Sequence, residues 1–348
     1  MAWGTPSRER RVLKAGHSSI AVTLPKPWAE AMNLRPGDLI VFDQNDDGTL
    51  YLKPAPLPGV SPTVAPFLVQ ARAFDTPGVL ERLIVGAYRV GHDAIEVRTD
   101  VPLAPERVEE VLAAARGLLG VSVVAQEPTR MVLQNFIDPS KYELPQLVQR
   151  MKMILVAFLE EMEEVLGRRT KSRRLSTLEE EGGKVLALLV RQLFLASRDW
   201  SLARRIGSPD PRQLLEWRVV VHALSELAEL FGETLALLND ESTKLPVAMR
   251  AILTQRLPEL KAELKGVVEA LMHPSLDRAC DVYHQSLELS GAWIPPTRGS
   301  RKGKTTPSSA PTLTRLLQRG SGYLSHLAEV AIDRAVAAGT ETILVEAA

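Results

Sequence analysis

The stretch that most constrains the fold is residues 10–43, RRVLKAGHSSIAVTLPKPWAEAMNLRPGDLIVFD. Apolar and β-branched residues recur through it, as at Val12, Ile20 and Val22, and this pattern predicts short strands. The same criteria predict further elements nearby: strands at 39–42 and 50–52, one helical turn at 27–32, and glycine-containing turns at 14–17, 36–38 and 46–48. We therefore predict a small all-β domain over residues 6–54.

Positive charge is concentrated at the start of this domain. The first 26 residues carry one acid, Glu9, against five basic side chains, a local net charge of +4: Arg8, Arg10, Arg11, Lys14 and Lys26. A β segment this short buries too little surface to be stable alone, so we expect two copies to associate. Dimerisation doubles the cationic face, as binding to a phosphate backbone requires. In the alternative interpretation, these charges only protect exposed strand edges from aggregation.

The motifs of this domain occur in a familiar order: a basic first strand, the run VTLPK at 22–26, a short helix, LRPGD at 34–38, and DDGTLYLKP at 46–54. In this order they resemble the AbrB/SpoVT swapped-hairpin domain. The resemblance implies that two chains interleave into one barrel, as an obligate homodimer, and that its basic face binds DNA. The candidate DNA contacts are therefore Arg8, Arg10, Arg11, Lys14 and Lys26, with His17 and Ser18 in the adjoining turn as weaker candidates.

Strand and helix patterns alternate in the next part of the chain, after a proline-rich segment at 54–59 that we expect to be a stiff linker. Strands are expected at 67–71, 94–98, 121–125 and 130–135, and helices at 77–90 and 104–117. This order predicts a small α/β linking module over residues 60–138.

From residue 143 onward, apolar residues recur at spacings of three and four, which predicts long amphipathic helices. The first runs through 147–165, and the others are expected at 174–198, 212–238, 246–272, 275–291 and 312–338. The hexamer LSELAE at 224–229 returns as LSHLAE at 324–329, one hundred residues later. This period favours two tandem three-helix repeats, over 143–240 and 243–340.

Three features of the helical part resemble the PhoU family, namely VLALLVRQL at 185–193, the two related hexamers and the hundred-residue period. The stretch LIVGAYRVGHDAIEV at 83–97 resembles the module that joins the two parts of archaeal PhoU-type regulators. The resemblance implies a role in phosphate uptake, through phosphate transporters and sensor kinases. Fusion to a swapped-hairpin domain implies a transcriptional regulator.

The carboxylate pattern departs from that family, whose closing helices usually carry E-R-x-x-D. Here Ser225 and Ser325 stand at the first acidic position, and only Glu229 and Glu329 remain at the second. A hard metal ion would find few ligands, so we expect no metal and no other cofactor. Should a metal bind, Glu229 and Glu329 are the remaining candidates, followed by Glu181.

The remaining features point away from catalysis and from membranes. The histidines of the helical part are scattered, no phosphate-binding loop is present, and the single cysteine, Cys280, excludes a disulfide framework, so we expect no enzyme. No apolar run approaches the roughly 20 residues that span a bilayer, which favours a cytoplasmic protein without membrane insertion. The 42 basic and 42 acidic residues balance, so DNA binding would be confined to one end of the chain.

Three hypotheses for function remain open. The leading one is a dimeric DNA-binding transcriptional regulator of the PhoU-like group, linked to phosphate uptake. The second is a dimeric signalling adaptor that does not bind DNA and docks on a phosphate transporter or a sensor kinase. The third is a small-ligand sensor with a pocket in residues 64–136. A basic loop at 298–304 is either a flexible connection or a further contact to DNA or an acidic partner.

Overall fold

The computed structural model describes residues 9–44, 48–55, 65–71, 76–168, 171–240, 245–293 and 309–339. The chain divides into two compact units, residues 1–63 and 64–348. Several predicted features lie outside the described residues: Arg8, Asp46, Asp47, the proline-rich segment beyond residue 55, and the basic loop at 298–304.

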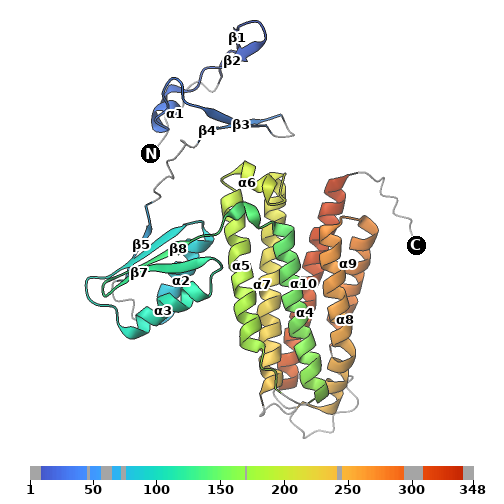
Figure 1. Ribbon diagram of the computed structural model, residues 1–348. Helices are drawn as coiled ribbons and strands as arrows, with labels where there is room; N and C mark the ends of the chain where they lie inside the picture. Colours follow the sequence, from blue (N-terminus) through green and yellow to red (C-terminus); the bar gives the residue numbers. More distant parts are fainter. Residues whose placement is uncertain are drawn as a thin grey trace. The chain divides into compact units, whose positions relative to one another are not determined.

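The first unit contains two separate antiparallel hairpins with a short helix between them (Figure 1). Strand β1 (Leu13–Ala15) pairs with β2 (Ser19–Ala21), and β3 (Ile40–Gln44) pairs with β4 (Leu50–Pro54). Helix α1 (Lys26–Ala31) begins after Pro25, and the proline at its second position has the fixed φ that favours a first turn. The strand-rich character that the sequence predicts is confirmed, whereas the closed dimeric barrel stays a prediction.

The second unit begins with a four-stranded sheet in the order β5-β6-β8-β7. Its elements follow the chain as β5 (Phe67–Gln70), α2 (Val79–Arg89), β6 (Ala94–Arg98), α3 (Pro105–Arg116), β7 (Val121–Glu127) and β8 (Arg130–Asn135). The parallel pair β5–β6 is joined by α2, while β8 lies antiparallel to both of its neighbours. The two helices contact each other and cover one face of the sheet, where apolar strand residues such as Val97 and Leu133 are buried. The predicted mixture of strands and helices is therefore confirmed.

Helices make up nearly all of the rest of the second unit. The long ones are α4 (Leu144–Arg168), α5 (Leu175–Ala196), α7 (Pro211–Asn239), α8 (Val247–Met272), α9 (Leu276–Gly291) and α10 (Ser309–Ala338). Each lies within a few residues of a helix expected from the apolar spacing. The sequence pattern did not predict the short α6 (Trp200–Arg205). Asp199 caps the start of this helix, because its carboxylate accepts hydrogen bonds from the Ser201 and Leu202 amides.

The six long helices pack as two sets of three. Helices α4, α5 and α7 contact one another, as do α8, α9 and α10, and the two sets meet along α4–α8 and α7–α10. The repeated hexamers lie on α7 and α10, and their leucines, such as Leu224 and Leu324, are buried in one continuous core. Within the described residues, no helix is long and apolar enough to cross a membrane.

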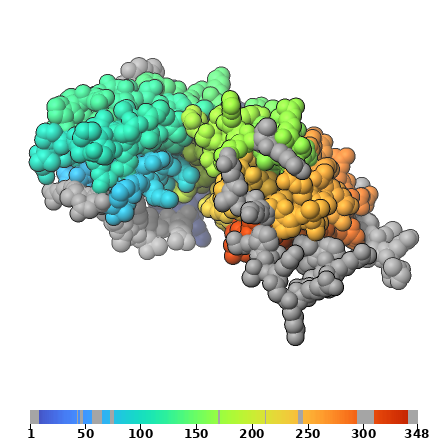
Figure 2. All heavy atoms as spheres, turned by 90° about the horizontal axis from the view of Figure 1, so that it is seen from below, coloured from blue at the N-terminus to red at the C-terminus, as the bar shows by residue number. Residues whose placement is uncertain are grey.

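The α/β module packs against the helices through α2 and α5. Figure 2 shows the blue-green module and the yellow-green helices in contact within one unit. Ala187 of α5 belongs to the apolar core of the module. The turn after α2 also lies close to α5, because a Cβ added at Gly91 would fall 2.8 Å from Leu195 Cδ2. The module and the helices therefore share an interior.

Candidate nucleic-acid interface

The β1–β2 hairpin displays the first group of candidate DNA contacts. Lys14 stands directly opposite Ile20 in the ladder, so the two side chains share one face of the hairpin. Gly16, with φ of +77°, begins the turn that also contains His17 and Ser18. A positive φ is costly for other residues, so the glycine fixes where the chain reverses.

The predicted basic residues are all on the surface wherever the structure describes them. Arg10 and Arg11 lie a few residues before β1, Lys14 lies within it, and each is exposed. Lys26 opens α1 and is also exposed, with its Nζ 3.7 Å from Glu30. That exposed pair is long and weak, so Lys26 remains available to a phosphate. A role of these side chains in DNA binding stays a prediction.

The loop that follows α1 is built by its own polar groups. Asp38 accepts a hydrogen bond from the Arg35 amide at 2.7 Å, and Gly37 adopts a φ of +101°. Asn33 has a φ of +52°, a region that asparagine tolerates better than most residues. These residues shape the turn that leads into β3, as the sequence interpretation of Gly37 and Asp38 expects.

The described residues of this unit form no buried interior of their own. No described residue between 9 and 55 is buried, and several large apolar side chains are largely exposed, including Ile20 at 78% and Leu39 at 76%. Isolated two-stranded sheets are marginally stable at best in water. Apolar surface of this extent on small hairpins is typical of an interface, so the geometry favours association with another chain.

Comparison with known families places one domain on this part of the chain. The model of a family described as "Antidote-toxin recognition MazE, bacterial antitoxin" matches residues 13–58. These residues carry a DNA-binding domain of the MazE and AbrB type, and such a domain points to a DNA-binding regulator. Comparisons with curated proteins and with solved structures gave no significant match.

The carboxylates considered as metal ligands are not brought together. Glu229 on α7 and Glu329 on α10 are both exposed, and so is Glu181 on α5. Across the part of the chain that the structure describes, no three His, Cys, Asp or Glu side chains form a group suited to a metal ion.

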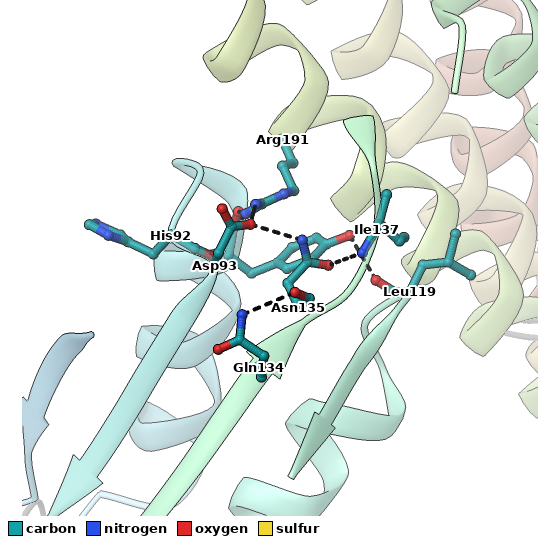
Figure 3. Close-up of polar contacts among 8 residues, drawn as sticks. His92, Asp93, Leu119, Gln134, Asn135, Ile137 and Arg191 are labelled. Atoms are coloured by element: carbon teal, nitrogen blue, oxygen red, sulfur yellow. Dashed lines mark hydrogen bonds and ion pairs between the residues drawn. The ribbon is translucent and has the colours of Figure 1, made fainter. Parts of the chain in front are cut away.

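A buried arginine that the sequence analysis did not single out joins the module to the helices (Figure 3). Arg191 of α5 is 2% exposed, and it donates hydrogen bonds to the carbonyl oxygens of Tyr88 and His92, at 2.6 and 3.0 Å. It also pairs with the Asp93 carboxylate, which accepts a second hydrogen bond from Asn135 at 2.9 Å. An arginine within the apolar run LALLVRQL is the sequence signal that could have revealed it.

The aromatic ring of Tyr88 lies under this arginine. The Arg191 guanidinium carbon is 4.8 Å from the ring centroid, and the Tyr88 hydroxyl donates to the Leu119 carbonyl oxygen at 3.1 Å. Burial raises the pKa of Tyr88 to about 12, although the nearby Arg191 charge partly opposes the shift. Burial also lowers the pKa of Arg191, with Asp93 opposing it. The cluster thus couples the position of α2 to that of α5.

Proposed function

We propose that the protein is a homodimeric, non-enzymatic transcriptional regulator that binds DNA through its first unit. The observation that supports the proposal most strongly is the combination of exposed basic side chains on the β1–β2 hairpin with a MazE and AbrB type domain at 13–58. Arg10, Arg11 and Lys14 are the central contacts of the proposed interface. Arg8, Lys26 and the turn residues His17 and Ser18 complete it.

Dimerisation follows from the exposed apolar surface of the same unit. Ile20, Leu39 and Phe42 are 59–78% exposed in the single chain, and association with a second copy would remove them from water. The partner copy also brings a second set of basic residues. Two hairpins then contact the duplex together, which raises the local positive charge that the phosphate backbone requires.

Binding of this kind is electrostatic and therefore sensitive to salt. Each neutralised phosphate contributes about −0.9 to the slope of log affinity against log salt concentration. The test measures fluorescence anisotropy of the protein's own upstream DNA with the full chain and with Arg10→Ala/Arg11→Ala/Lys14→Ala. We expect the triple variant to lose at least about 1,000-fold in affinity at physiological salt, because it loses three charge-assisted contacts that are worth about 1.5–3 kcal/mol each.

A matched control distinguishes loss of the proposed DNA contacts from a general loss of positive charge. Arg168→Ala/Arg256→Ala/Arg278→Ala removes the same charge from the helices, where each arginine forms an ion pair with a nearby carboxylate. The control should bind DNA like the wild type. Equal affinities of wild type and the N-terminal triple variant would refute the assignment of the interface.

The proposal extends to the helical part as a PhoU-like pair of three-helix repeats, over 143–240 and 243–340, joined to the first unit by the module at 60–138. The packing of α4, α5 and α7 against α8, α9 and α10 is consistent with two repeats. The link to phosphate uptake rests on the sequence resemblance alone. Its test is a genome-wide map of bound DNA at high and low phosphate, in which bound sites should change with phosphate supply.

A second candidate function is a signalling adaptor whose first unit only dimerises. The exposed apolar hairpins favour it as much as they favour DNA binding, because either role needs a second chain. In that case the helices would dock on a phosphate transporter or a sensor kinase. Deleting residues 1–54 would then reduce dimerisation without reducing capture of such a partner, whereas the regulator proposal predicts loss of DNA binding.

A further inference from the structure

A cleft of about 780 Å³ lies where the α/β module meets the helices. Its walls come from α2, the end of α3 and the middle of α5. Two helix-interior glycines, Gly86 on α2 and Gly183 on α5, line it, and a Cβ added at either would meet no described atom within 4 Å. The missing side chains keep the cleft open. Its volume lies within the range of small-molecule pockets, about 300–1,000 Å³.

Arginines dominate the charge of this cleft. Arg82 and Arg89 stand on the α2 wall. Burial lowers the pKa of Arg89, and the nearby positive charges of Arg218 on α7 and of Arg82 lower it further. Among the residues that the structure describes, these three guanidinium groups have neither an ion-pair nor a hydrogen-bond partner. Within the described part of the chain, positive charges are therefore gathered here without ion-pair partners.

The other charged groups around the cleft do not supply the missing negative charge. Arg116 at the end of α3 pairs with Glu109, and Glu180 on α5 accepts from Lys184 at 2.5 Å. Glu81 is the remaining carboxylate on the wall. After the two pairs are set aside, Arg82 and Arg89 remain on the wall with one acid, and the positive charge of Arg218 acts on Arg89 from α7, so the cleft retains a surplus of positive charge.

The N-terminus of α2 is not what makes the cleft attractive to an anion. The Glu81 amide in its first turn already donates to the Glu110 carboxylate of α3 at 3.1 Å, and the Leu80 amide also donates to that carboxylate. The available donors are the arginine side chains themselves. A guanidinium group presents a planar fork of N–H donors that matches two oxygens of a phosphate group.

We propose that this cleft binds a small molecule that carries one or more phosphate groups. Arg82 and Arg89 bind the phosphate oxygens, and Arg218 adds positive charge beside Arg89. The volume admits a nucleotide, and inorganic phosphate shares the same recognition chemistry. The inference does not depend on DNA binding, and it gives the protein an effector site at the contact between α2 and α5, where a bound ligand would stabilise the packing of the module on the helices.

The experiment measures binding to the full chain by isothermal titration calorimetry and by thermal shift, with ATP, AMP, inorganic phosphate and adenosine as separate probes. A phosphate-bearing probe should bind and raise the Tm, since a ligand selective for the native state stabilises it. Arg82→Ala/Arg89→Ala should weaken binding about 100-fold or more, because two charge-assisted contacts are lost. Gly183→Leu keeps every charge but fills the cleft, and it should exclude ATP.

The control is Arg168→Ala/Arg256→Ala, which removes the same charge from distant positions on α4 and α8 and should bind like the wild type. Helical circular dichroism checks that every variant is folded. Tighter binding of ATP than of inorganic phosphate identifies an organic phosphate, the reverse identifies phosphate itself, and both support the site. The proposal is overturned when no phosphate-bearing probe binds, when adenosine binds equally well, or when a folded Arg82→Ala/Arg89→Ala variant keeps wild-type affinity.

Discussion

Glu263 on α8 is a buried carboxylic acid whose protonation should control the stability of the helical part. The residue is 5% exposed, and its Oε1 atom has no hydrogen-bond partner among the described groups. It lines a cavity of about 460 Å³ between α8 and α9, together with Glu288. Burial raises the pKa of Glu263 from 4.5 to about 7, since a charged carboxylate is poorly solvated there.

The sign of the effect follows from this raised pKa. The neutral acid is favoured in the folded protein, so its stabilising effect is fully present below pH 4.5 and is lost as the pH rises through 7. A shift from 4.5 to about 7 corresponds to about 3.4 kcal/mol at 1.36 kcal/mol per unit. About 2.5 kcal/mol of this loss falls between pH 5 and pH 8, an upper value because water in the cavity would weaken it.

The perturbation is Glu263→Gln, which keeps the shape and removes the titration. Urea unfolding followed by helical circular dichroism at pH 5 and pH 8 gives the free energy of unfolding of each protein. From pH 5 to pH 8, the free energy of unfolding of wild type should fall by about 1–2 kcal/mol more than that of the variant. Glu288→Gln is the control, because that side chain lines the same cavity but is 71% exposed. Parallel pH profiles for wild type and Glu263→Gln would refute the reasoning.

Three further predictions concern packing and association. Arg191→Met should lower the free energy of unfolding by about 2–4 kcal/mol in a urea titration, because it leaves buried carbonyl oxygens without their donor; an unchanged midpoint would contradict this. Gly120→Ala should lower the free energy of unfolding by about 2 kcal/mol, since φ is +72° and the new Cβ would clash with the Ile137 side chain. Gly183→Ala should raise it by up to about 1 kcal/mol, because alanine favours a helix and the new Cβ meets no described atom. Thermal midpoints equal to that of wild type would argue against both predictions. Ile20→Asp should weaken the dimer in sedimentation velocity, while Val247→Asp, at a helix position that is even more exposed, should not; a dimer unaffected by Ile20→Asp would remove that residue from the interface.

The helical part was predictable because helix formation and burial both follow a local spacing. The run from Leu147 to Val165 carries one apolar stripe, and all of its stripe residues are buried in α4. The short α6 was not predicted, because a helix of six residues is too short to show a clear apolar period. The hydrogen bonds that the Asp199 side chain accepts at its start cannot be seen in a hydropathy pattern.

The sites that involve distant residues were the least predictable. Arg191 pairs with Asp93 across 98 residues of sequence, and the charge of Arg218 on α7 acts on Arg89 of α2 only in the folded protein. Sequence spacing cannot show such contacts, because they depend on how the module packs against the helices. By contrast, Arg10 and Lys14 lie near one another in sequence, so their basic cluster is visible in the sequence alone.

The central claim is that the basic hairpin of the first unit binds the DNA backbone. The most direct measurement is the slope of log affinity against log salt concentration for wild type and for Arg10→Ala/Arg11→Ala/Lys14→Ala. In a dimer, six cations are removed, so the slope of the triple variant should be shallower than that of wild type by up to about 5. Two parallel salt dependences, with equal affinities, would contradict the claim.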